Sequence, residues 1–193
     1  MDTLYFFSTT VILLLIFFEY VRREQLKKEN FIDNYELPKQ IFTNLKKHYP
    51  NLKDKDFDLI DKAYKMYLKL FIQFGRYLIP IPSVILDRVQ IEFMHCKEYN
   101  NFSKQAFGFY LTKSKFTKMK SKNEPNIDTS TVWTLSCDYE NIDAKNPEKL
   151  PKIFEIDKLI NIDDGIKYTI NCDDENLYCV KKLEKILFLH RGG

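Results

Sequence analysis

The sequence predicts a mainly α-helical protein with an N-terminal transmembrane helix, a domain of about four helices and a small C-terminal β-hairpin. Three observations indicate this fold. A long uncharged apolar run opens the chain, apolar residues recur at steps of three or four through its middle, and alternating β-forming residues appear only after residue 166. Apolar residues make up 45% of the 193 residues, which is enough for one domain with a hydrophobic core.

The first 21 residues have the properties of a membrane anchor. Residues 3–18 carry no charge, and the apolar run reaches Val21 with Glu19 as its one interruption. A run of about 18 residues spans roughly 28 Å, close to the roughly 30 Å hydrocarbon core of a bilayer. A secretory signal fits less well, because Met1-Asp2-Thr3 has no basic residue and no small-residue cleavage site follows. We therefore expect residues 1–21 to form a single-pass anchor, with residues 4–21 in lipid.

Charges that flank this anchor predict its orientation. Arg22, Arg23, Lys27 and Lys28 follow the apolar run, and only Asp2 precedes it. Positive residues stay on the cytoplasmic side, so the bulk of the chain is expected there. Residues 22–37 are expected to form a charged juxtamembrane helix or linker, and residues 38–193 a single domain. The four cysteines form no C-x-x-C pair, and we expect reduced thiols.

The first two helices of the domain follow from Pro38 and from helical spacing. Pro38 can open a helix that ends before Tyr49-Pro50. Asn51 or Asp54 is expected to cap the next helix, which ends near Gly75. Its apolar positions repeat at steps of three or four and are Phe57, Ile60, Tyr64, Leu68, Phe71 and Phe74.

Two further helices and a hairpin complete the expected domain. Ser83 is a natural N-cap for a helix that continues, across a bend, to Tyr110, and Thr129 or Ser130 can cap a fourth helix to Tyr139. The hairpin region covers about 154–193, with a turn at residues 163–165, strands over 167–172 and 177–180, and a terminal helix over 181–190.

The balance of charge excludes a nucleic-acid-binding protein of the usual basic type. Net charge is +3, and the two signs alternate along most of the chain, so no nucleic-acid partner is expected. One local excess of lysine is either a solvated loop or, beside an anchor, a contact for anionic lipid headgroups. Its members are Lys113, Lys115, Lys118, Lys120 and Lys122.

No complete catalytic, metal or cofactor motif is present in the sequence. His95 and Cys96 are adjacent on a helix and point about 100° apart, which does not suit a shared metal. Asp87 and Glu92 lie five residues apart, so they share a helical face poorly as an acid–base pair. We predict no catalytic residue, no metal site and no cofactor. The candidate pocket consists of Asp87, Glu92 and Thr112.

The region from residue 45 to residue 180 resembles uncharacterised bacterial membrane-anchored proteins related to the plant glycine-rich domain-containing family. The resemblance starts at Tyr49-Pro50 and continues through residues 82–87, 92–93, 99, 102, 106–108, 111, 133, 137, 150–151, 154, 157, 162, 164–165, 168 and 172. The chain departs from that group at three places. It has Gln90-Ile91 for Trp-His, Phe102-Ser103 for Phe-Cys, and Thr112-Lys113 for His-His.

The resemblance implies the fold and a bacterial inner-membrane location, and it implies no activity. With the anchor and the missing chemistry, it leads us to expect a membrane-tethered, non-catalytic interaction module on the cytoplasmic side, with membrane lipid and an unidentified protein as partners. A divergent metal-dependent enzyme is the alternative, and an anionic-lipid-binding domain is a weaker one.

Overall fold

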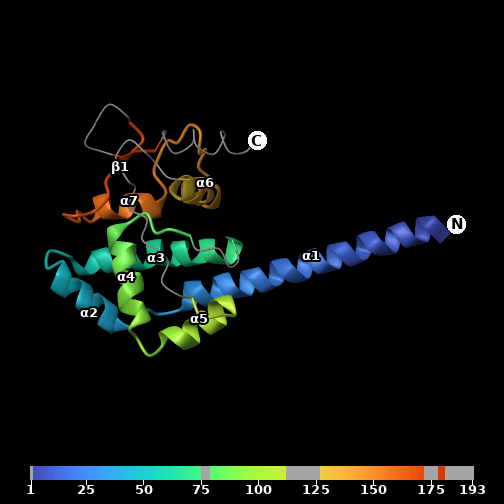
Figure 1. Ribbon diagram of the computed structural model, residues 1–193, viewed down its shortest axis with the longest axis horizontal. Helices are drawn as coiled ribbons and strands as arrows, with labels where there is room; N and C mark the ends of the chain where they lie inside the picture. The colour runs from blue at the N-terminus through green and yellow to red at the C-terminus, as the bar shows by residue number, and fades with distance from the viewer. Residues whose placement is uncertain (1, 75–78, 112–126, 172–177, 181–193) are drawn as a thin grey trace.

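The computed structural model describes residues 2–74, 79–111, 127–171 and 178–180, without the side chains of residues 2–8, 74, 127 and 128. The described residues form seven helices and two short strands (Figure 1). These elements are α1 (Asp2–Asn34), α2 (Lys39–His48), α3 (Asp54–Phe74), α4 (Val84–Met94), α5 (Tyr99–Phe107), α6 (Ile127–Glu140), α7 (Lys152–Leu159), β1 (Tyr168–Thr169) and β2 (Tyr178–Cys179). The mainly helical prediction is confirmed.

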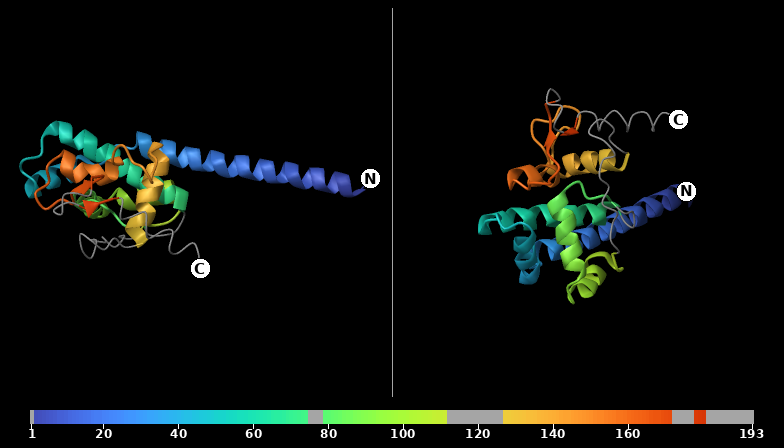
Figure 2. Two further views of the ribbon diagram at one scale, coloured as in Figure 1. Left: turned by 90° about the horizontal axis from the view of Figure 1, so that it is seen from above. Right: turned by 60° about the vertical axis from the view of Figure 1, so that its left-hand side comes forward.

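Helix α1 leaves the domain as one long rod (Figures 1 and 2). The expected juxtamembrane segment is therefore a helix, continuous with the apolar segment before it. Every residue from Val11 to Phe18 is between 51% and 66% exposed, whereas Ile32 is only 1% exposed. The C-terminal end of α1 thus belongs to the domain core, and its apolar N-terminal part does not contact the core.

The transmembrane part of the expected fold is not found among the described residues. Within them, none of the helices combines the length and the apolar character that crossing a membrane requires. The expected lipid segment starts at Leu4, and the side chains of residues 4–8 lie outside the described ones.

An aromatic cluster joins α1, α4 and α5 at the centre of the domain. The Phe102 ring lies 5.7 Å from the Phe31 ring and 4.6 Å from the Tyr35 ring, measured between centroids, and 5.0 Å from the Phe93 ring. Tyr64 of α3 meets Phe93 edge-on at 6.4 Å. Large rings bury much apolar area each, so this aromatic cluster contributes much of the packing between the three helices.

The described part of residues 38–193 forms six helices, α2 to α7, where about four were expected. Residues 95–98 form turns, so α5 is separate from α4. Helix α7 follows Pro151, which stands at its N-cap. Thr129 and Ser130 lie inside α6 and do not cap it, because α6 begins at Ile127. The breaks between helices depend on backbone turns that apolar spacing does not reveal.

The expected β-hairpin is wrong, because β1 and β2 pair in parallel. Tyr178 N donates to Lys167 O at 2.9 Å, and Val180 N donates to Thr169 O at 2.9 Å. A hairpin needs antiparallel strands joined by a tight turn. The expectation of reduced thiols is also wrong at Cys179, which is disulfide-bonded, whereas Cys96 and Cys137 are free. The expected terminal helix over 181–190 lies outside the described residues.

Candidate functional site: a polar groove at the start of helix α4

The position of α4 is set by a carboxylate from α7. Ser83 caps α4, since its Oγ accepts from Leu86 N at 3.2 Å. Asp157 is 1% exposed and accepts from Ser83 Oγ at 2.7 Å. It also accepts from the backbone N of Val84 at 2.8 Å and of Ile85 at 3.1 Å. These amide groups have no partner within the helix, and an anion is favourable at a helix N-terminus.

The same carboxylate holds the chain after the turn at 163–164. Ile166 N donates to Asp157 Oδ2 at 2.9 Å. Burial raises the pKa of Asp157, and the hydrogen bonds from Ser83, Val84, Ile166 and Ile85 act in the opposite direction. Asp157 therefore fixes two walls of one groove, the first turns of α4 and the 163–164 turn.

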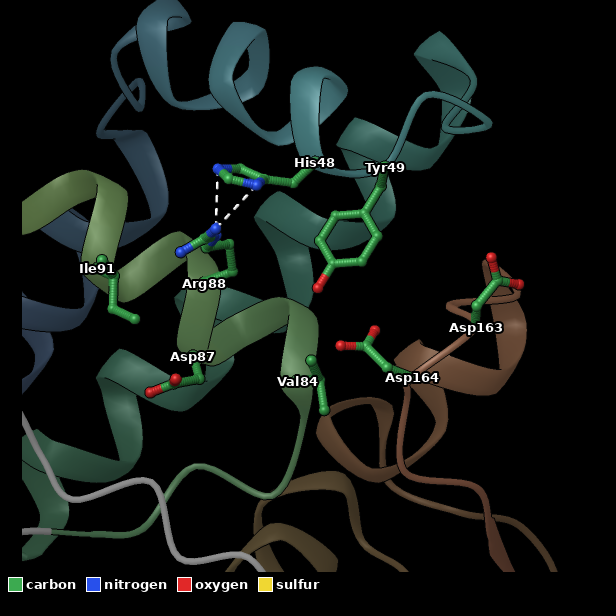
Figure 3. A pocket seen from close by; sticks show the side chains of 8 residues that line it. All are labelled: His48, Tyr49, Val84, Asp87, Arg88, Ile91, Asp163 and Asp164. Atoms are coloured by element: carbon green, nitrogen blue, oxygen red, sulfur yellow. Dashed lines mark hydrogen bonds between the residues drawn. The ribbon is translucent and has the colours of Figure 1, made fainter.

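This groove has a volume of about 480 Å³ and opens between the end of α2, the first part of α4 from Val84 to Ile91 and the 163–164 turn (Figure 3). Residues of α4 that line it are spaced at three or four, so they share one helical face. The complete lining is His48, Tyr49, Val84, Asp87, Arg88, Ile91, Asp163 and Asp164. Hereafter "the groove" means this set. Its volume is in the range of small-ligand sites.

One edge of the groove is a cluster of mutually engaged polar side chains. Arg88 Nη2 lies 2.9 Å from His48 Nδ1 and 2.8 Å from His48 Nε2 (Figure 3). Glu92 Oε1 lies 3.9 Å from both Arg88 Nε and His48 Nε2. Glu92 Oε2 accepts from Asn44 Nδ2 at 2.8 Å. The charged side chains of α4 on this edge are thus held in place by polar side chains of α2.

The opposite edge pairs an aromatic hydroxyl with an acid. The Tyr49 hydroxyl points into the groove towards the Asp164 carboxylate (Figure 3). Burial raises the pKa of Tyr49, and the charge of Asp164 raises it further, while Arg88 opposes the increase. Tyr49 therefore stays a neutral hydrogen-bonding group at physiological pH.

The structure brings together part of the predicted candidate pocket. Asp87 lines the groove, and Glu92 lies beside it through its contacts with Arg88 and His48. Thr112 and the lysines at 113, 115, 118, 120 and 122 lie outside the described residues. Of the anchor flank, Arg22 is exposed, and Arg23 Nε pairs with Glu19 Oε1 at 2.8 Å.

Gln90 and Ile91 fall on two sides of α4. Ile91 lines the groove with an apolar side chain. Gln90 is 1% exposed and faces the core. The Tyr64 hydroxyl donates to Gln90 Oε1, and Gln90 Nε2 donates to the Tyr99 hydroxyl at 2.9 Å. The Tyr99 hydroxyl in turn donates to Leu111 O at 2.6 Å. Gln90 thus connects a buried polar chain.

Seven of the eight groove residues were not predicted as site residues, and five of these seven are polar: His48, Tyr49, Arg88, Asp163 and Asp164. In the sequence, His48 marks the face of a helix and Asp163-Asp164 mark a turn, and neither signal indicates that they meet. Within the described part of the chain, no group of three or more His, Cys, Asp or Glu residues could hold a metal ion.

Comparison with known proteins gives one match. Residues 27–184 match the sequence model of a family described as UCP032817-like. No curated protein and no solved structure matches the chain. The matched range includes all the groove residues and begins after the exposed apolar part of α1.

Proposed function

We propose that this chain, which belongs to the UCP032817-like family, is a membrane-tethered, non-catalytic interaction module. In this proposal the apolar N-terminal part of α1 enters lipid, and the domain presents the groove to another protein. The resemblance to bacterial relatives of the plant glycine-rich domain-containing proteins remains part of the proposal, with a bacterial inner membrane as the location.

The observation that carries the proposal is the exposure of apolar side chains around the whole circumference of α1. Eight consecutive residues, Val11 to Phe18, are each at least 51% exposed. Consecutive helical residues point in all directions, so no single protein face could cover them. A helix that is apolar all round favours a lipid environment. The uncharged residues 3–8 lengthen this run in the sequence.

The side of the membrane follows from the charges next to the run. Arg22, Arg23, Lys27 and Lys28 stand on the domain side, so the domain is proposed to face the cytoplasm. Disulfides are rare in that compartment. The disulfide bond of Cys179 argues against this side of the membrane. Alkylation of thiols in intact cells decides the question, and a Cys179 thiol that reacts without added reductant would support a cytoplasmic domain. A Cys179 thiol protected from alkylation until a reductant is added would place the domain on the oxidising side.

The groove supports an interaction role more than a catalytic one. Arg88 and His48 lie next to Glu92, whose carboxylate also accepts from Asn44. Such a surface of mutually engaged polar side chains suits recognition, because the side chains are already ordered.

The tether is tested by extraction of membranes with alkaline carbonate. Full-length protein should remain in the membrane pellet. Leu14→Lys places a charge in the middle of the apolar run, at a cost of about 2.5–3.5 kcal/mol for insertion, and should move much of the protein to the supernatant. Leu159→Lys is the matched control, since Leu159 is equally exposed at 55% but belongs to the domain. Full-length protein found in the aqueous fraction would contradict the proposal.

The interaction role is tested by photo-crosslinking in membranes. A photoreactive phenylalanine analogue replaces Ile91 in the groove or Leu159 outside it. A discrete adduct from position 91 that is lost with Asp164→Lys, and that does not form from position 159, would support the groove as the docking surface. Equal adducts from the two positions, or none from position 91, would count against it.

A further inference from the structure

We infer that α1 is a rigid post that holds the groove at the membrane-distal end of the domain, out of reach of lipid headgroups. This inference rests on the proposed tether. It adds the direction in which the groove faces.

The junction between the apolar run and the domain is an unbroken helix. Residues 19–34 contain neither Gly nor Pro, the residues that most weaken a helix. Three pairs of side chains, each about one turn apart, form hydrogen bonds along this junction. Arg23 Nε donates to Glu19 Oε1 at 2.8 Å. Lys27 Nζ donates to Glu24 Oε1 at 2.6 Å, and Gln25 Nε2 donates to Glu29 Oε1 at 3.0 Å. Each pair stabilises the local helix by a few tenths of a kcal/mol. The junction therefore bends little.

The C-terminal end of α1 is fastened to the domain by both packing and charge. Ile32 is 1% exposed, and Phe31 stacks on Phe102 of α5 with 5.7 Å between the ring centroids. Lys69 of α3 lies with Nζ 2.5 Å from Asp33 Oδ1, and Lys65 Nζ donates to Asp33 O at 3.1 Å. Contacts with two different helices prevent the post from rotating against the domain.

The groove is at the end of the domain opposite to the post. Figure 1 shows the N-terminal part of α1 extending to one side, while α2, the start of α4 and the end of α7 lie at the other. The groove lies between the end of α2, the start of α4 and the 163–164 turn that follows α7. At about 1.5 Å per residue, the helix from Arg22 to Asn34 adds about 20 Å between the end of the apolar run and the far end of α1.

These three features together determine what can reach the groove. A rod fixed in the domain and unbroken at the membrane leaves no hinge through which the domain could turn the groove towards the headgroups. Lipid headgroups are therefore not its ligands.

The inference is tested with full-length protein in nanodiscs of phosphatidylcholine and phosphatidylglycerol that contain nitroxide-headgroup lipid as quencher. A fluorescent amino acid replaces either Leu26, which is 48% exposed near the apolar run, or Lys47, which is exposed beside the groove. Quenching at position 26 should exceed quenching at position 47 several-fold. Equal quenching at the two positions, with the protein still bound to nanodiscs, would overturn the inference and leave the tether intact.

A matched variant tests whether the rigidity of α1, and not only the distance of the groove from the membrane, keeps position 47 away from the lipid. Six residues, Gly-Gly-Ser repeated, are inserted after Arg23, so that the domain is free to tumble against the membrane. This insertion should raise quenching at position 47 towards that at position 26. An unchanged ratio in a protein that still binds nanodiscs would show that helix continuity does not orient the domain. Loss of binding by the parent protein would instead reject the proposed tether.

Discussion

Ser83 Oγ donates a 2.7 Å hydrogen bond to Asp157, across 74 residues of sequence, and so joins the N-cap of α4 to the middle of α7. Three backbone amides share the same carboxylate. The groove depends on this junction, because its α4 wall and its turn wall are both attached to Asp157.

Asp157→Asn should destabilise the protein by about 3 kcal/mol, since an amide presents donors to groups that are donors themselves. Urea unfolding of the purified full-length protein in detergent, followed by circular dichroism, measures the change. Asp163→Asn is the control, because Asp163 is exposed in the adjoining turn and its replacement should change stability little. If the two variants unfold alike, Asp157 does not hold the junction.

Ser83→Ala should lower the free energy of unfolding by about 1–2 kcal/mol, less than Asp157→Asn does. Only the N-cap hydrogen bond of α4 and one of the four hydrogen bonds to Asp157 are lost. The double variant should be less destabilised than the sum of the single ones, since both remove the same bond. Strict additivity in the same unfolding assay would argue that the two side chains act independently.

Gly165→Ala should destabilise the turn by about 1–3 kcal/mol through overpacking. A Cβ at this position would lie 2.8 Å from Asp157 Cβ and 3.0 Å from Ile162 O. Gly108 offers a contrast, because its φ is +80° but nothing lies within 4 Å of an added Cβ. Gly108→Ala should therefore cost about 1 kcal/mol, from the backbone alone. A smaller loss for Gly165→Ala than for Gly108→Ala in thermal unfolding would refute the packing argument.

Gln90→Leu should lower the free energy of unfolding by about 1–3 kcal/mol. The buried Tyr64 hydroxyl loses the acceptor for its hydrogen bond, and the Tyr99 hydroxyl loses the donor that Gln90 supplies. Tyr64→Phe removes one of those hydroxyls. In the Tyr64→Phe background, Gln90→Leu should then cost about 1 kcal/mol less. Equal costs in both backgrounds would mean that the polar chain contributes no coupling.

Alkaline pH should unfold the protein through groups that folding keeps protonated. Burial raises the pKa of Cys137 from 9.0 to about 12 and holds the pKa of Tyr64 well above 10.0. Both groups have a higher pKa in the folded protein than in the unfolded chain. Their contribution to stability is therefore complete below the pKa values of the unfolded chain, and it is lost as the pH rises through the pKa values of the folded protein. The free energy of unfolding should therefore fall from about pH 9 upwards. Cys137→Ala should lessen the slope between about pH 9 and pH 11, and an unchanged slope would exclude Cys137 as a contributor.

Much of the helical framework was predictable because helical spacing records which residues are buried. Ile60, Tyr64, Leu68 and Phe71 were predicted from their spacing and are each at most 2% exposed. Ser83 was predicted as an N-cap from its position after Pro82, and its Oγ does accept from Leu86 N. Both signals are local, so the sequence contains them without knowledge of the rest of the fold.

The sequence could not predict which distant residues meet. His48, Asp87 and Asp164 line one groove although they come from a helix end, a helix face and a turn. The pairing direction of β1 and β2 was also mispredicted, because alternation indicates a strand but not its neighbour. The break between α4 and α5 at residues 95–98 likewise depends on how the two helices pack.

By itself, the sequence determined the helical class, the main helices, the uncharged N-terminal run and the scarcity of catalytic motifs, because composition and short-range periodicity set these properties. Only the tertiary structure decided that Asp157 joins α4 to the turn, that polar side chains converge beside it, and that α1 runs unbroken into the core. Those features arise from contacts between residues far apart in the chain, and the free energy of such contacts depends on the packed geometry.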